Sequence, residues 1–134
     1  MTPDPDNHAV SAHWRRAQAH LREAMSINVE LAPSAAIHSA YYAMFRAALA
    51  VIVRHDGVDT IKTHRGIHAR YGQMLAASED GRAQARALKS ASREWMVGDY
   101  GSDPCPTPDD ATSVVARAVA FLRYNAATFG FPLE

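Results

Sequence analysis

Apolar residues recur at helical spacing in the first stretch of the chain. They stand three or four positions apart, at Val10, Trp14, Ala17, Leu21 and Ala24. Arginines and a glutamate occupy the other positions, so the stretch has a single apolar stripe, as a helix that faces a core does. We expect a helix over residues 8–30, preceded by a flexible leader over residues 1–7 that contains two prolines.

The second stretch is apolar over a wider face. Its large apolar residues are Ile37, Tyr41, Met44, Phe45, Leu49 and Ile52. Pro33 suits the first turn of a helix, and His55-Asp56-Gly57 ends it. A helix that is apolar around so much of its circumference is expected at the centre of the fold. The pattern predicts a central helix over residues 33–54, with more apolar surface than one small bundle needs.

Three further helices are predicted from their start signals, over residues 63–77, 79–96 and 108–127. Thr63 is a reasonable N-cap for the first, and acidic residues stand in the first turn of the second, where the helix dipole favours them. The third follows Thr107-Pro108-Asp109-Asp110, which combines a cap, a proline at the first position and acidic residues.

The remaining segments are irregular. Residues 98–108 hold two glycines and three prolines, which is typical of a loop, and residues 128–134 are expected to form a tail. No segment alternates between apolar and polar residues as a strand does. The fold class is therefore an all-α, up-down bundle of four to five helices. The length of 134 residues fits a single domain, residues 1–134.

Composition narrows the function classes. The chain has 14 basic and 14 acidic residues, so it does not grip nucleic acid through overall charge, although a local patch is compatible with this balance. Twelve of the basic residues are arginine and two are lysine. This excess reflects either the base composition of the genome or a choice of arginine for planar recognition of phosphate.

The sequence predicts a cytoplasmic protein that does not contact a membrane. Cys105 stands alone, so neither an internal disulfide nor a cysteine metal site is expected. The N-terminus lacks the apolar core of a signal peptide. The best apolar run, residues 47–53, is too short to cross a bilayer.

Two adjacent tyrosines on the central helix are candidate binding residues. Tyr41 and Tyr42 point about 100° apart on a helix, so at most one of them is expected to be fully buried. The other should present its hydroxyl at a helix edge, beside Arg46 one turn further on. Aromatic residues at helical spacing are more often core than binding groups, and this alternative stays open.

The segment Lys62-Thr63-His64-Arg65 begins the third helix. A helix N-terminus offers free amides, and the flanking basic residues would make it an anion site, although capping with surface charge explains the same pattern. The positive setting should lower the pKa of His64. His64 and His68 stand four apart, which suits a metal, but no third ligand completes the set, so no metal and no cofactor is expected.

The fourth helix carries a cationic stripe with steps of four, three and four, at Arg82, Arg86, Lys89 and Arg93. Such a stripe is either a solvated face or a surface that follows a phosphate backbone. Arg93 stands close to Asp99 and Tyr100 at the mouth of the following loop. We expect Tyr41 or Tyr42 to share a polar cleft with these three residues.

In their order, these segments resemble the HEPN superfamily, and most closely the small stand-alone prokaryotic HEPN proteins that are often encoded beside nucleotidyltransferases. The resemblance spans about residues 9–127. The motifs that carry it are the AYYAMF-x-AA signature of residues 40–48, the TH-x-G segment of residues 63–66, Arg93 with Asp99-Tyr100, and the closing Ala118 with Phe121.

The resemblance implies a helical bundle that forms a homodimer and belongs to a toxin–antitoxin or defence module. The surplus of apolar surface on the central helix also favours a dimer. Many HEPN proteins are metal-independent ribonucleases that use an arginine and a later histidine with four to six residues between them. Here Gly98, Asp99 and Tyr100 occupy those positions after Arg93. The fold would have to bring His64 beside Arg93 instead.

Two function hypotheses follow. In the first, the protein is a toxin-like or defence-associated enzyme that cleaves RNA without metal, with Arg93 stabilising phosphate charge and His64 acting as acid or base. In the second, it is a non-catalytic HEPN module that binds a nucleotide, RNA or a partner nucleotidyltransferase antitoxin. The binding residues would then include Lys62, Arg65 and Arg93.

Overall fold

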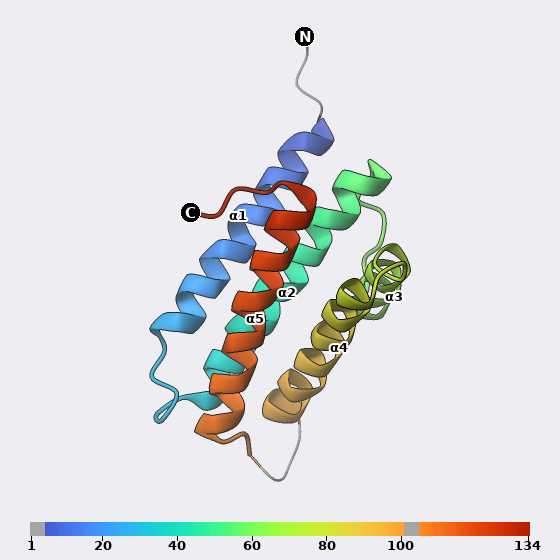
Figure 1. The fold of residues 1–134 in the computed structure, drawn as a ribbon. Coiled ribbons are helices and arrows are strands. Elements are labelled where there is room, and N and C mark those ends of the chain that lie inside the picture. Colours follow the sequence, from blue (N-terminus) through green and yellow to red (C-terminus); the bar gives the residue numbers. More distant parts are fainter. Residues whose placement is uncertain (1–4, 101–104) are drawn as a thin grey trace.

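Five α-helices make up the fold (Figure 1). The computed structural model describes the backbone of residues 5–100 and 105–134 and the side chains of residues 8–96 and 105–134. No strand occurs within this described part of the chain. The helices are α1 (Pro5–Ser26), α2 (Pro33–Asp56), α3 (His64–Met74), α4 (Glu79–Tyr100) and α5 (Pro108–Phe129). The prediction of an all-α bundle is confirmed.

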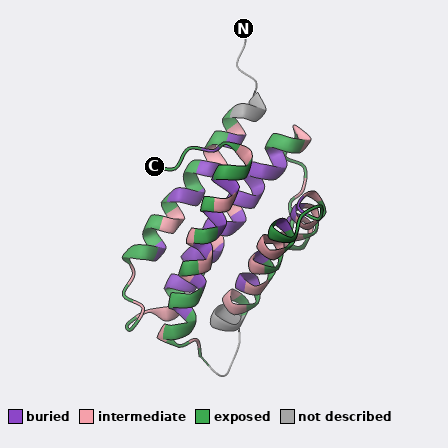
Figure 2. Cartoon of the chain, viewed as in Figure 1, coloured by how far each residue is buried: buried purple, intermediate pink, exposed green. Residues whose placement is uncertain are grey.

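Helix α2 lies at the centre of the bundle and contacts each of the other four helices. Fifteen of its 24 residues are buried, and Figure 2 shows the buried positions running along its length. The prediction of a central helix is therefore confirmed. The expectation that this helix has surplus apolar surface was wrong, because the neighbouring helices cover its apolar residues.

The expectation that no segment could cross a membrane also needs correction. Within the described residues α2 is long and apolar enough to do so by length and composition alone. However, 83% of its apolar window is buried inside the bundle. This burial is what the core helix of a bundle shows, and the apolar sequence is explained by packing.

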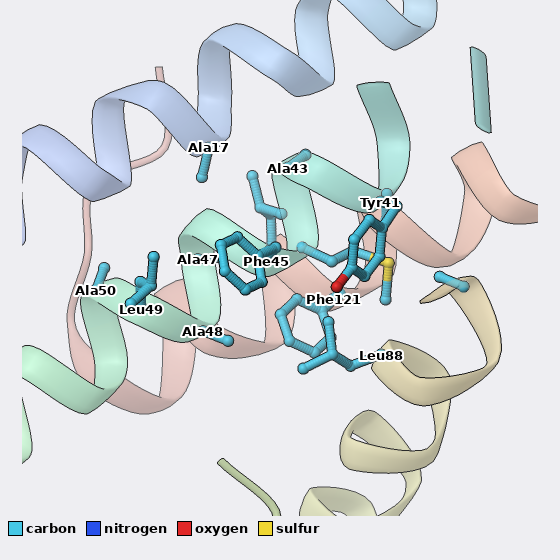
Figure 3. Packing of buried hydrophobic residues seen from close by; sticks show 14 of the residues in the cluster. Ala17, Tyr41, Ala43, Phe45, Ala47, Ala48, Leu49, Ala50, Leu88 and Phe121 are labelled. Atoms are coloured by element: carbon cyan, nitrogen blue, oxygen red, sulfur yellow. The ribbon is translucent and has the colours of Figure 1, made fainter. Parts of the chain in front are cut away.

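Small side chains and large side chains of α2 lie on different parts of its surface. Ala43 and Ala47 lie on the part of α2 near Ala17 of α1, and all three are fully buried (Figure 3). Alanine at these positions lets the two helix backbones approach closely. Elsewhere Tyr41 of α2 lies with Phe121 of α5, among larger side chains (Figure 3). Where Tyr41 meets α5, α2 therefore carries a larger side chain than where Ala43 and Ala47 lie near α1.

Capping interactions confirm three of the predicted helix ends. Gly57 ends α2 with a φ of 76°, a left-handed conformation that glycine adopts without strain. The Thr63 hydroxyl accepts a hydrogen bond from the Gly66 amide at 3.0 Å, which caps α3. Thr107 and Asp110 form a reciprocal capping box at the start of α5.

The limits of α1 differ from the prediction. The helix begins at Pro5, so residues 5–7 of the expected leader are helical, and it ends at Ser26 rather than at residue 30. Asn28 explains the early end, because its side-chain oxygen accepts from the Glu30 amide at 3.0 Å and its carbonyl accepts from the Ala32 amide at 2.9 Å. These bonds form a turn in place of another helical turn.

The ends of the other four helices differ as well: α2 ends at Asp56 and α5 at Phe129, each two residues beyond the expected residues 54 and 127. Helix α3 stops at Met74, before the expected residue 77, and α4 continues to Tyr100, past the expected residue 96. The predicted loop thus begins inside a helix. Gly98 lowers helix propensity by only about 1 kcal/mol relative to alanine, which is not enough to end a helix. Residues 101–104 of that loop lie outside the described residues.

Residues 128–134 do not form a free tail. Phe131 is buried and stacks on Trp14 of α1, with 4.4 Å between ring centroids. The Trp14 indole N–H donates to the Pro132 carbonyl at 2.6 Å, and the Gln18 amide donates to the same oxygen at 3.2 Å. The Arg54 guanidinium lies over the Phe131 ring at 4.0 Å. We call these five residues the C-terminal clasp.

Candidate functional site

A cavity of about 480 Å³ lies between α3 and α4. We call it the α3–α4 cavity. It is lined by His64, Arg65, His68, Ala69, Lys89, Ser92, Arg93 and Met96. His64 and Arg93 are therefore brought to one cavity by the packing of two helices that are separated in the sequence.

The lining of the cavity is cationic. Arg65, Lys89 and Arg93 are exposed, and no carboxylate is among the lining residues whose side chains the structure describes. Glu94, the acidic residue next to Arg93, instead accepts a hydrogen bond from Arg117 of α5 at 3.0 Å. Three cations around an open cavity, with no counter-charge among the described lining residues, favour the binding of an anion such as phosphate.

Tyr41 connects the two histidines of the cavity. Its hydroxyl lies 2.7 Å from Nδ1 of His64 and 2.9 Å from Nε2 of His68. The four-residue step that resembled a metal pair therefore serves a hydrogen-bonded triad. Among the described residues no group of three His, Cys, Asp or Glu side chains gathers in a way that could hold a metal ion.

Aromatic rings fix the orientation of His64. Its ring stacks on Phe45 of α2, with 4.3 Å between centroids, and on Trp95 of α4, with 5.4 Å between centroids. Trp95 also stacks on Tyr41, with a centroid distance of 5.1 Å. The ring of His64 on α3 is therefore held between side chains of α2 and α4.

Burial sets the protonation states of the triad. It lowers the pKa of His64, and it lowers the pKa of His68 to about 4, with smaller contributions from the charges of His64 and Lys89. It also raises the pKa of Tyr41 to about 12. The lowered pKa of His64 was expected, but its cause is burial rather than the neighbouring positive charges. At neutral pH both imidazoles and the phenol are uncharged.

The glycine of the TH-x-G segment is required by close packing. A Cβ atom on Gly66 would lie 2.7 Å from Cγ2 of Ile61 and 2.9 Å from the Thr63 hydroxyl oxygen. That hydroxyl is the N-cap of α3, and His64 is the first residue of the helix. Gly66 therefore helps to position His64 by letting the start of α3 close tightly.

Of the two tyrosines, Tyr41 is the buried one and Tyr42 is half-buried, as the 100° spacing predicted. Tyr42 contacts His38, with 4.8 Å between centroids, and Trp95, with 5.8 Å. Arg46 points to α1, where it lies 3.3 Å from Nδ1 of His13. Tyr42 and Arg46 are not among the residues that line the α3–α4 cavity.

Of the other predicted site residues, some line the α3–α4 cavity and some do not. Arg65 lines the cavity, whereas Lys62 does not and donates to the Asp59 carbonyl at 2.9 Å. The side chains of Asp99 and Tyr100 lie outside the described residues, so the predicted cleft is described only at Tyr41 and Arg93. Tyr41 bonds a histidine of the cavity that Arg93 lines.

The cationic stripe on α4 divides between two environments. Lys89 and Arg93 line the cavity, whereas Arg82 donates to the Ala76 carbonyl at 2.8 Å near the start of the helix. Arg86 is exposed and is not among the lining residues. Half of the stripe thus belongs to the candidate site.

Two residues of the site were not chosen from the sequence. His68 had been noted for its spacing from His64, but only as half of an incomplete metal pair. Trp95 lies one residue beyond Glu94 in the segment that contains Arg93, and an indole two positions after a candidate phosphate-binding arginine was the available signal.

The fold is consistent with that of a HEPN domain. The model of the HEPN domain family matches residues 10–127, which is most of the chain, and the chain belongs to this family. Comparison with curated proteins gives no match.

Proposed function

We propose that this HEPN-domain protein binds RNA at the α3–α4 cavity and cleaves it without a metal ion, as a toxin-like or defence-associated component. The observation that supports the proposal is that His64 and Arg93 line the same cationic cavity. The histidine that the family's usual spacing would place after Arg93 is thus supplied by α3.

The chemistry assigned to each group follows from its contacts. Tyr41 occupies Nδ1 of His64, which leaves Nε2 as the nitrogen that can take the proton of a ribose 2′-hydroxyl. The 2′-oxygen then attacks phosphorus, a cyclic phosphate forms and the 5′-oxygen leaves. Arg93 stabilises the charge that develops on the phosphorane, with Arg65 and Lys89 binding the adjacent phosphates.

The test is cleavage of a model RNA in the presence of a chelator. We expect His64→Ala and Arg93→Ala each to lower kcat/KM by about 10²-fold or more, since acid–base and charge-stabilising groups typically contribute that much. Arg86→Ala is the matched control, because it removes an exposed cation of the same helix outside the cavity. Losses within about threefold for both test variants would refute the assignment.

A second candidate is a non-catalytic module that binds RNA or a nucleotide. The observation that favours it is the low pKa of both histidines, which leaves little imidazolium at neutral pH to protonate a leaving group. In this case wild type would bind RNA but leave it intact, and Arg93→Ala would weaken binding.

We further propose a homodimer and a nucleotidyltransferase partner. This proposal rests on the family resemblance alone, because the apolar surface of α2 that had favoured a dimer is covered within one chain. Light scattering at micromolar concentration tests it, and a monomer would count against it.

A further inference from the structure

The Tyr41 hydroxyl has two histidine partners but only one proton to donate. It lies 2.7 Å from Nδ1 of His64 and 2.9 Å from Nε2 of His68. If both rings are neutral, each nitrogen is either a donor or an acceptor. Tyr41 can donate to one ring and accept from the other, but it cannot donate to both.

This restriction couples the two rings. When Tyr41 donates to Nδ1 of His64, the proton of that ring is on Nε2, and His68 donates to Tyr41 from its own Nε2. When Tyr41 donates to Nε2 of His68, that ring carries its proton on Nδ1, and His64 donates from Nδ1. As long as Tyr41 donates to one of the two rings, both rings hold their proton on the same nitrogen, either Nε2 or Nδ1, and the hydroxyl proton decides which.

We propose that Tyr41 is a proton relay that joins His64 and His68 into one acid–base unit. This inference rests on the proposed RNA cleavage and deepens it by adding a positioning residue, Tyr41, and a second acid–base group, His68. Both histidines line the cavity. In the relay, the remaining nitrogen of each ring, Nε2 of His64 and Nδ1 of His68, is the one that faces the bound RNA.

The relay moves one proton from the 2′-hydroxyl to the 5′-oxygen and needs no proton from another source. Bare Nε2 of His64 takes the 2′-hydroxyl proton, and Nδ1 of the same ring releases its proton to the Tyr41 oxygen. Tyr41 passes its own proton to Nε2 of His68. Nδ1 of His68 then gives its proton to the departing 5′-oxygen. One N–H bond forms and one breaks on each ring, and Tyr41 ends with one proton as it began.

The relay explains how a pair of neutral histidines could serve as both base and acid. A reaction with independent groups needs one ring already protonated, and burial with the Lys89 charge opposes this at His68. Among the side chains that the structure describes, the polar and charged groups around the pair are Arg65 of α3, Lys89, Ser92 and Arg93 of α4, and Tyr41 of α2. None of them is a carboxylate that would stabilise an imidazolium.

The first test reads the protons directly. Nitrogen NMR of the two imidazole rings at neutral pH gives the tautomer of each, with His64→Gln and His68→Gln used for assignment. We expect the same tautomer, or the same mixture, on both rings. An arrangement in which both rings donate to Tyr41, with its proton turned toward Ser92, would give His64 protonated on Nδ1 and His68 on Nε2, and would overturn the relay.

The second test compares two leaving groups. Tyr41→Phe should lower kcat/KM about 10²-fold on a diribonucleotide, whose 5′-oxygen needs a proton to leave. On uridine 3′-(4-nitrophenyl phosphate), whose nitrophenolate leaves without one, the loss should stay within about threefold. Tyr71→Phe is the matched control, because it removes an equally buried hydroxyl, bonded to Asn125 at 2.8 Å, that does not line the cavity.

The outcomes separate the relay from the proposed function. Equal losses on both substrates would show that Tyr41 only holds His64 in place, and the relay would be wrong. If wild type cleaves neither substrate, the proposed cleavage fails, and the catalytic use of the relay fails with it. Matched tautomers in that case would still establish the coupling of the two rings, because the NMR measurement needs no substrate.

Discussion

The C-terminal clasp and the α3–α4 cavity use similar residue types for different roles: the clasp stabilises the fold, and the cavity is a candidate binding site. The clasp contains Arg54 and Trp14, and the cavity is lined by two arginines, with Trp95 stacked on its histidine His64. In the clasp, Arg54 lies over Phe131 and donates to the Phe129 carbonyl at 2.6 Å, while the Trp14 indole is bonded to Pro132. These groups satisfy one another. In the cavity, Arg65, Lys89 and Arg93 are exposed around an open space.

The difference shows how a stabilising arginine is told from a binding one. A guanidinium whose donors and ring face are occupied by its own chain contributes to the fold and has little left for a ligand. A guanidinium that lines a cavity with other cations raises the local electrostatic energy, and an arriving anion relieves it. The contacts of the residue, rather than its type, carry the distinction.

Breaking the clasp should have the largest effect on stability. Trp14→Ala removes a buried indole, its stacking on Phe131 and its hydrogen bond to the Pro132 carbonyl. We expect the free energy of unfolding to fall by about 3–5 kcal/mol, measured by urea denaturation. Binding of RNA by the remaining folded protein should be unchanged. A matching loss of RNA affinity would contradict the division between the two regions.

Acidification should weaken the cavity region rather than the clasp. Burial depresses the pKa of His68 to about 4, so the unfolded chain binds a proton that the folded chain does not between roughly pH 6.5 and 4. Stability from this ring is thus present above pH 6.5 and is lost as the pH falls. The effect on the unfolding free energy should be about 1 kcal/mol, discounted because the ring is partly exposed.

The measurement is the difference in unfolding free energy between pH 7 and pH 4.5. His68→Gln should show a smaller difference than wild type. The salt-bridged Asp56, whose pKa Arg70 lowers, adds little in this range, because the stability from that lowered pKa is lost mainly below about pH 4, the ordinary pKa of an unfolded aspartate. An unchanged difference in His68→Gln would show that other groups cause the pH dependence.

The smallest expected effect is a change in how RNA affinity depends on salt concentration, and it concerns the cavity only. Arg65→Ala removes one of the three cations that line the cavity. The slope of log affinity against log salt for a single-stranded RNA should become shallower by about 0.7, the value for one phosphate contact. A 2′-O-methyl RNA, which cannot be cleaved, is the ligand. Arg86→Ala should keep the wild-type slope, and a similar change in both variants would indicate general attraction instead.

Much of the fold could be predicted from the sequence, because caps and apolar stripes are local signals. Thr63 and Thr107 marked the starts of α3 and α5, and both are caps in the structure. The end of α1 was missed because the turn at Asn28 depends on a few side-chain and backbone bonds. The clasp was missed because the partner of Phe131 is Trp14, and periodicity gives no information on such a distant contact.

Part of the candidate site could also be predicted from local sequence signals. His64 and Arg93 were paired from the sequence, and they do line one cavity. The role of Tyr41 could not be derived, because its hydroxyl reaches both histidines only when α3 packs on α2. Pattern placed Tyr41 on a core helix, but its hydrogen bonds depend on how the helices pack together.

The clasp also has a consequence for the order in which the chain is made. The Trp14 indole and the Pro132 carbonyl that it contacts are separated by 118 positions. During synthesis α1 and α2 emerge early and can pair, but the Trp14 indole lacks its partners until residues 131–132 have left the ribosome. Closure of this long-range contact therefore follows the pairing of α1 with α2, and chains that stop before Phe131 would leave the Trp14 indole without its stacking partner.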